Sequence, residues 1–178
     1  MGSNNSKTKI NYEDVQNASK YPFKNYNGNN DNDNTNNNNI NNINNINKIN
    51  NINNINNIKK KYAIINTLDK NFQTCLIQNT IPIQEEEDII NSILNDKYSN
   101  NITIIIYGLN SNDESIYLKY EQLVKLGIKN VFIYTGGMFE WLLLQDIYGR
   151  ELFSTTSKEL DILKYKPRKI LNVLYLGM

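Results

Sequence analysis

The fold of this chain is decided by residues 102–107, Ile-Thr-Ile-Ile-Ile-Tyr, and by the segments that follow them. Residues 102–107 are continuously apolar and mostly β-branched, which is typical of a central strand in a parallel sheet. A polar loop from Gly108 to Asp113 comes next, then a helix that ends at Gly127, then a second apolar strand at residues 130–134. This order of strand, helix and strand predicts an α/β domain.

The segments on either side continue the alternation of strands and helices. Residues 62–66 are predicted to form a buried strand, and residues 80–83 a second, shorter one. The glutamates at residues 85–87 predict the first turn of a helix, because acidic side chains there complement the helix dipole. A first strand and helix are expected at residues 10–22, and a further helix at residues 139–147. The side chains expected on the buried faces of the helix after the glutamates and the helix after the polar loop are Ile89, Ile90, Ile93, Leu94, Ile116, Tyr120, Leu123 and Val124.

The helix after the polar loop has alternative start signals. Ser111 and Glu114 have the spacing of a capping box, in which each side chain bonds the backbone of the other residue. Asn112 or Asp113 is an equally suitable cap, because each carries a short side-chain oxygen. The sequence leaves these alternatives open.

A low-complexity stretch interrupts the N-terminal part of the chain. Residues 25–57 are mostly Asn, with Ile at every third position from Ile40 onward. A period of three matches neither the 3.6 residues of a helical face nor the alternation of a strand, so no packed face is expected. We therefore expect this stretch to be disordered or loosely extended.

Composition excludes several classes of function. The 178 residues carry a formal net charge of +1 and no His, and the densest basic run is Lys59 to Lys61. Nucleic-acid binding is therefore not expected, and a metal centre would lack its commonest ligand. The lone cysteine, Cys75, can form neither an internal disulfide nor a cluster of thiolate ligands. We expect a cytoplasmic protein with no metal and no cofactor.

The first residues contain a possible lipidation signal. Met1-Gly2-Ser3-Asn4-Asn5-Ser6 fits the N-myristoylation pattern, with Gly2 as the acceptor and Ser6 at the preferred position. A single myristoyl chain binds a membrane only weakly, and only Lys7 and Lys9 are near enough to assist. The expectation is weak tethering at the cytoplasmic face of a membrane.

The region between residues 102 and 141 carries several landmarks of one family. After residues 102–107 and the polar loop come Leu126-Gly127, Asn130-Val131, Gly136-Gly137 and Trp141. In order and spacing they resemble the second half of a rhodanese, or sulfurtransferase, domain. The upstream half resembles it more weakly, at residues 64–68 and 77–81. The resemblance implies a small three-layer α/β domain over residues 10–149, with a central parallel sheet flanked by helices. It also implies that the Asn-rich residues 25–59 are a disordered insertion inside this domain.

The resemblance also places the active-site loop, and the loop is degenerate. Gly108 stands where the family carries its catalytic cysteine, and the loop's basic residue is missing, with Asp113 and Glu114 near its place. Measured to Ser115, the resemblance makes the loop one residue longer than the sulfurtransferase form, as in the cell-cycle phosphatases of the same fold. It comprises Gly108, Leu109, Asn110, Ser111, Asn112, Asp113, Glu114 and Ser115. No catalytic residue is therefore expected.

Other side chains could replace the missing chemistry. Cys75 has no cationic neighbour closer in sequence than Lys70, so a buried and inert thiol is expected. Asp69, Asp113 and Glu114 could together form a carboxylate site for a cation, but exposed loop acids are the favoured interpretation. Trp141 and its neighbours at residues 142–144 are expected to pack in the core of the last helix.

The resulting hypothesis is a catalytically inactive rhodanese-like domain that serves as a binding or scaffolding module for an unknown protein partner. The alternative is a divergent enzyme that uses non-cysteine chemistry in the same cleft. Beyond the domain, residues 150–178 are expected to form a helical extension, with Thr156 and Glu159 at capping-box spacing, and an apolar tail. The tail at residues 170–176 is expected to pack on the domain, with partner binding as the alternative.

Overall fold

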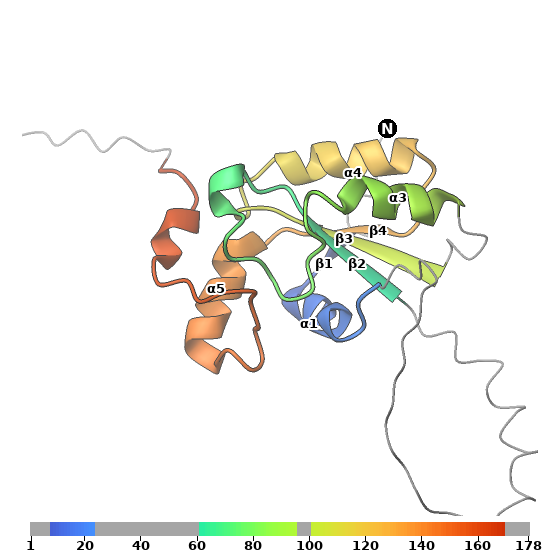
Figure 1. The fold of residues 1–178 in the computed structure, drawn as a ribbon. Helices are drawn as coiled ribbons and strands as arrows, with labels where there is room; N and C mark the ends of the chain where they lie inside the picture. Colours follow the sequence, from blue (N-terminus) through green and yellow to red (C-terminus); the bar gives the residue numbers. More distant parts are fainter. Residues whose placement is uncertain (1–7, 24–60, 96–100, 170–178) are drawn as a thin grey trace, which may run out of the picture.

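A computed structural model describes residues 8–23, 61–95 and 101–169 (Figure 1). Its centre is a parallel sheet of four strands in the order β1-β4-β3-β2. The strands are β1 (Lys9–Ile10), β2 (Lys61–Asn66), β3 (Ile102–Tyr107) and β4 (Val131–Tyr134). The helices are α1 (Tyr12–Lys20), α3 (Glu86–Asn95), α4 (Ser115–Lys125) and α5 (Gly137–Tyr148), with two short 3-10 helices, η1 (Lys70–Phe72) and η3 (Ile162–Tyr165). The predicted small α/β fold with a central parallel sheet is confirmed.

Three of the sequence-based expectations concern residues outside the described ranges. They are the acceptor role of Gly2, the disordered insertion at residues 25–59 and the packing of the tail at residues 170–176. Within the described ranges, no helix combines the length and apolar character needed to cross a membrane.

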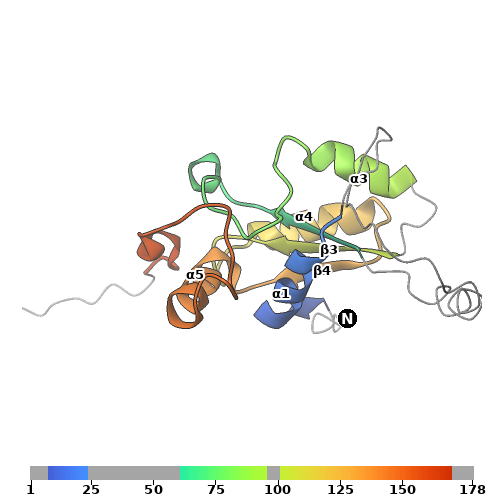
Figure 2. The ribbon, with the colours of Figure 1, turned by 60° about the horizontal axis from the view of Figure 1, so that its bottom comes forward.

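The sheet is the middle of three layers. Helices α3 and α4 cover one face, and α1 and α5 cover the other (Figures 1 and 2). Each face has its own apolar cluster. The cluster under α1 and α5 includes Val15, Met138 and Trp141, which confirms Trp141 as a core residue. The cluster under α3 and α4 consists largely of isoleucines from the sheet and from both helices.

Strand β3 contributes to both clusters, because successive side chains of a strand point to opposite faces. Ile105 and Tyr107 lie in the α1–α5 cluster, whereas Ile104 and Ile106 lie in the α3–α4 cluster. All four are almost completely buried. Since burying one isoleucine side chain contributes about 1.5–3 kcal/mol, the continuous apolar run is what allows β3 to occupy the centre of the sheet.

The two ends of residues 24–60 are held next to each other. The amide of Phe23 donates to the carbonyl of Tyr62 at 2.7 Å, and the amide of Tyr62 donates to the carbonyl of Tyr21 at 3.1 Å. Strand β1, which precedes this stretch, pairs with β4, and β2, which follows it, pairs with β3. The segments on both sides of residues 24–60 therefore belong to one sheet.

Four local predictions were wrong. Residues 80–83 form no strand beyond a single bridge between Ile64 and Thr80, because the Thr80 amide and hydroxyl both donate to the carbonyl of Ile77 and make a turn. Leu94, Val124 and Leu143 are exposed instead of buried. The other expected face residues, Ile89, Ile90, Ile93, Ile116 and Leu123, are buried, and Tyr120 packs partly buried against their cluster.

The expected helical extension after α5 is largely irregular and belongs to the core. Phe153 and Tyr165 are 2% and 0% exposed, and Phe153 stacks edge-on against Trp141 with ring centroids 5.1 Å apart. Thr156 does not cap a helix, because its hydroxyl accepts from the amide of Leu76 at 3.0 Å. Glu159 instead accepts from the two following amides and pairs with Lys164, which leaves only the short η3 as regular structure.

The buried position of Tyr165 leads to a stability prediction. Tyr165→Ala should lower the free energy of unfolding by about 3–5 kcal/mol, because the cavity it leaves adds to the lost burial of an aromatic ring. Leu163→Ala, at a neighbouring side chain that is 62% exposed, is the matched control and should change it by less than about 0.5 kcal/mol. Urea unfolding of the full chain measures both, and equal effects would show that the extension is not part of the cooperative core.

Candidate functional site

The polar loop lies at the carboxyl end of the sheet, where α/β folds place their ligands. It joins the end of β3 at Tyr107 to the start of α4 at Ser115. A cavity of about 530 Å³ opens over it. The cavity is lined by Thr67, Leu68, Asp69, Phe72, Leu109, Asn110, Asn112, Asp113, Glu114, Ser115, Lys166 and Arg168. Four parts of the chain therefore meet here: the segment after β2, η1, the loop and the C-terminal extension.

Gly108 has no room for a side chain. A Cβ placed on it would overlap the carboxylate of Asp113 and would lie 2.8 Å from both Asp113 Cγ and Ile116 Cγ2. Heavy atoms that are not bonded do not approach this closely, so any side chain here would have to displace the carboxylate. The space next to the first loop residue is thus already filled by Asp113.

The Asp113 carboxylate accepts hydrogen bonds from both ends of the loop. Its Oδ2 accepts from the amide of Leu109 at 2.7 Å, and its Oδ1 accepts from the amide of Ser115 at 3.0 Å and from the Ser115 hydroxyl. Of the proposed caps, Asp113 is therefore the residue that bonds the start of α4. The capping box of Ser111 and Glu114 is not formed, because Glu114 occupies the cap position without a side-chain bond.

The loop is also fastened to the first turn of α5. Gly137 has a φ of 61°, and a Cβ there would lie 2.5 Å from the carbonyl oxygen of Gly108 and 2.8 Å from the amide of Asn110. The next two amides, of Met138 and Phe139, donate to the carbonyls of Gly108 and Leu109, both at 3.0 Å. Only glycine allows this contact, which explains why Gly137 follows β4.

The end of β2 supports the loop from the other side. Ser115 Oγ lies 2.7 Å from Thr67 Oγ1, which ties the start of α4 to the segment after β2. The buried Asn66 accepts from the amide of Leu68 at 3.0 Å and from Gln73 at 2.8 Å. These bonds determine where Leu68 and Asp69 enter the cavity wall.

Two cations reach the cavity from the C-terminal extension. Lys166 and Arg168 line it, although the loop has no basic residue. The side-chain amide of Asn110, which is 5% exposed, donates to the carbonyl of Tyr165 at 2.7 Å and so holds the extension against the loop. Sequence reasoning missed both cations because they lie some 50 residues beyond the loop, in a segment with no regular pattern. Pro167, which lies between the two cations, was the only local signal of a turn in the sequence.

The three carboxylates predicted to meet do line the same cavity. Asp69, Asp113 and Glu114 are all wall residues. Across the described ranges, however, no group of three or more His, Cys, Asp or Glu side chains is arranged to hold a metal ion. Asp113 already uses both of its oxygens within the loop, so the proposed carboxylate site for a cation is not supported.

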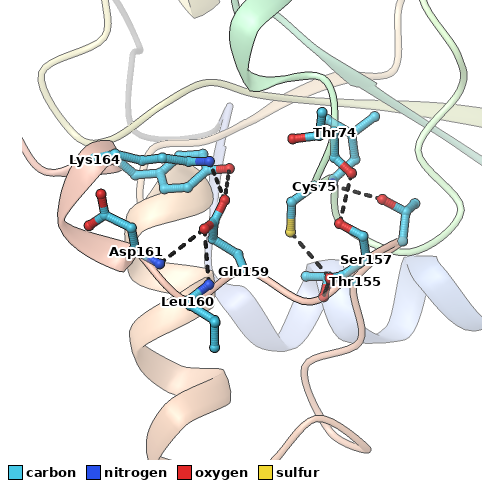
Figure 3. A network of polar contacts seen from close by, with 11 residues as sticks. Thr74, Cys75, Thr155, Ser157, Glu159, Leu160, Asp161 and Lys164 are labelled. Carbon is cyan, nitrogen blue, oxygen red and sulfur yellow. Dashed lines mark hydrogen bonds and ion pairs between the residues drawn. The ribbon is translucent and has the colours of Figure 1, made fainter.

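Cys75 does not substitute for the missing nucleophile. It is 1% exposed, as expected, and is not part of the cavity wall. Its thiol donates to the carbonyl of Ser157 at 3.4 Å, and the Ser157 hydroxyl donates back to the carbonyl of Thr74 at 2.8 Å (Figure 3). The cysteine therefore fastens the extension to the segment after η1. Nearby, the pair of Glu159 and Lys164 stabilises the turn before η3 and lowers the pKa of Glu159 (Figure 3).

The architecture defines a small three-layer domain with a parallel sheet and a polar loop directly after β3. A family model of the rhodanese-like domain matches residues 13–144, from α1 to α5. The chain therefore belongs to the rhodanese-like domain family. It has no significant match among curated protein sequences or solved structures. The buried residues Phe153 and Tyr165 lie beyond the matched range.

Buried tyrosines next to the site lead to a prediction about pH. Tyr107 accepts from the amide of Ile77 at 3.2 Å and lies 3.0 Å from the Thr80 hydroxyl, and burial raises its pKa and that of Tyr165. Burial and the charge of Glu140 also raise the pKa of Tyr134. Unfolded tyrosines ionise near pH ~10, so the stability from these neutral phenols is complete below that pH and is lost as the pH rises above it.

We expect the free energy of unfolding to fall steadily above pH ~10, together with the appearance of phenolate absorbance. Tyr107→Phe removes one of the three groups and should make this fall shallower, whatever its effect on stability at neutral pH. Urea titrations across the alkaline range measure the slope. A slope identical in wild type and Tyr107→Phe would contradict the assignment.

Proposed function

We propose that this rhodanese-like domain transfers no sulfur and serves as a binding or scaffolding module. The observation that carries the proposal is the carboxylate of Asp113, which lies beside Gly108 and accepts from the loop amide of Leu109. The space beside the position of the family's cysteine is thus occupied by a carboxylate of the domain itself, which accepts a hydrogen bond from the loop.

The chemistry of sulfur transfer supports this proposal. A sulfurtransferase needs a thiolate, which forms a covalent persulfide and is stabilised by loop amides and a basic residue. Gly108 supplies no sulfur, and the Asp113 carboxylate would repel an incoming anion such as thiosulfate. The thiol of Cys75 faces Ser157 instead of the cavity. The alternative of a divergent enzyme with non-cysteine chemistry is less well supported, because both oxygens of the Asp113 carboxylate already accept hydrogen bonds from the loop.

The apolar and cationic residues that line the cavity support a binding role. The cavity combines apolar walls, such as Phe72 and Leu109, with the cations of Lys166 and Arg168 on the extension. Neither cation forms an ion pair with another residue of the described ranges. Unpaired cations beside apolar surface suit a protein partner that presents acidic and apolar side chains.

A weak membrane tether is a further part of the proposal. Gly2 and Ser6 fit the myristoylation pattern, and one acyl chain supports only reversible membrane binding. The module would then act in the cytoplasm, with part of its population at the cytoplasmic face of a membrane.

The purified full chain should produce thiocyanate from thiosulfate and cyanide no faster than buffer. Cys75→Ser should give the same background rate. Gly108→Cys alone should also remain at background, because the new side chain would have to displace the Asp113 carboxylate. Colorimetric detection of thiocyanate measures all three proteins.

An active, cysteine-containing rhodanese in the same buffer is the positive control. Turnover by the wild-type chain that disappears in Cys75→Ser would contradict the proposal and identify Cys75 as a nucleophile. Turnover that persists in Cys75→Ser would also contradict it, in favour of non-cysteine chemistry.

Affinity capture from native lysate should recover partners that depend on the two cations. Lys166→Glu/Arg168→Glu should lose most of the proteins retained by the wild type, because it reverses the charge of the cavity wall. Gly2→Ala should keep the soluble partners and lose the membrane-associated share of the chain. Quantitative mass spectrometry of the captured proteins and fractionation of the lysate measure the two effects.

Lys129→Glu/Lys158→Glu is the matched control, because it makes the same charge change at exposed sites outside the cavity. Equal losses in both double variants would show that capture reflects net charge and not the site. An unchanged membrane fraction in Gly2→Ala would disprove the lipid tether.

A further inference from the structure

A second hollow lies between α3 and α4 and is not part of the degenerate site. It has a volume of about 700 Å³, and its walls include Glu87 and Ile90 from α3 and Leu118 and Gln122 from α4. We call it the α3–α4 groove. Three of its apolar wall residues are exposed: Ile83 by 51%, Leu118 by 71% and Leu126 by 49%. Exposed aliphatic side chains that gather around one hollow mark a binding groove.

The groove continues from the cavity over the loop. Thr67, Leu68 and Ser115 line both hollows. The two hollows therefore adjoin each other at these three residues.

The two hollows differ in charge. The wall of the first cavity carries the acids Asp69, Asp113 and Glu114 beside the cations Lys166 and Arg168. Half of the exposed wall residues of the groove, Ile83, Leu118 and Leu126, are aliphatic, and the charge of its Lys119 is paired with Glu86. A segment that is charged first and apolar afterwards matches this order.

The chain itself has such a segment. Lys166 and Arg168 already line the first cavity, Lys169 follows them, and residues 170–176 are Ile-Leu-Asn-Val-Leu-Tyr-Leu. Nine residues follow Lys169 in this sequence, and an extended chain of that length reaches about 30 Å. The 10-residue α3 is only about 15 Å long, so the segment is long enough to run along the groove.

We propose that residues 170–176 dock in the α3–α4 groove of their own chain, next to the loop cavity from which Lys166 and Arg168 lead. The apolar side chains of the segment cover Ile83, Leu118 and Leu126. An intramolecular occupant has an advantage over a partner, because a short tether gives an effective concentration in the range of about 1 mM. The docked segment completes the α3–α4 layer of the fold.

Hydrogen exchange of the full-length chain, followed by mass spectrometry, tests the proposal. The amides of residues 171–176 should exchange at least about tenfold more slowly than in an unstructured peptide. Leu118→Asp, and independently Ile83→Asp, should abolish this protection by placing a charge in the apolar wall. Leu152→Asp is the matched control, because Leu152 is 59% exposed and lies outside the groove. It should leave the protection unchanged.

Each other result overturns the proposal. No protection in the wild type means that the segment is undocked, and protection that survives both groove variants means that it docks elsewhere. Protection that falls on roughly tenfold dilution identifies a second copy as the occupant.

An engineered disulfide provides a measurement that does not depend on the folding of the charged variants. Leu118→Cys/Leu174→Cys should oxidise within one chain faster than Leu152→Cys/Leu174→Cys, because only the first pair is brought together by docking. Equal rates of oxidation also overturn the proposal.

Discussion

The carboxylate of Asp113 inside the loop after β3 is the interaction on which the rest of this site depends. It bonds the amides at both ends of the loop, those of Leu109 and Ser115, and so determines the curvature of the loop and the first turn of α4. Only a loop of this shape presents the carbonyls of Gly108 and Leu109 to the amides of α5. A negative charge that is fixed at this point by hydrogen bonds takes the role that a bound anion would have in an anion-binding loop. Asp113 thus gives the loop amide of Leu109 an acceptor from within the domain.

The fold could be predicted from the sequence where one physical signal was much stronger than any competing one. Residues 102–107 are apolar on both faces, which only a central strand can satisfy, and the acidic residues at positions 85–87 marked the start of α3 to within one residue. Residues 80–83 looked equally β-prone, but two bonds from Thr80 to one carbonyl turned the chain away from the sheet. Competition of this kind between a side chain and the sheet is not visible in a local pattern.

For the site, the sequence predicted only which family residues are missing from the loop and which acids the loop contains. The sequence itself shows that Gly108 has no side chain and that Asp113 and Glu114 are acidic. The role of Asp113 as an internal acceptor required its distances to the loop amides. Lys166 and Arg168 were missed because their position depends on an irregular segment, which is held by Asn110, Cys75 and buried aromatic rings. Tertiary contacts of this kind have no sequence period. The same fold thus supports a different surface chemistry with charges taken from outside the family's matched range.

The backbone bonds between residues 21–23 and Tyr62 have a consequence for how this protein can evolve. They join the segments on either side of residues 24–60, so this pairing involves none of the residues in between. For a flexible loop in general, each doubling of length costs only about 0.6 kcal/mol, because loop-closure entropy grows with the logarithm of length. Pairing of this kind at the base of an insertion would let repeats of Asn and Ile be gained or lost by replication slippage at little cost to folding.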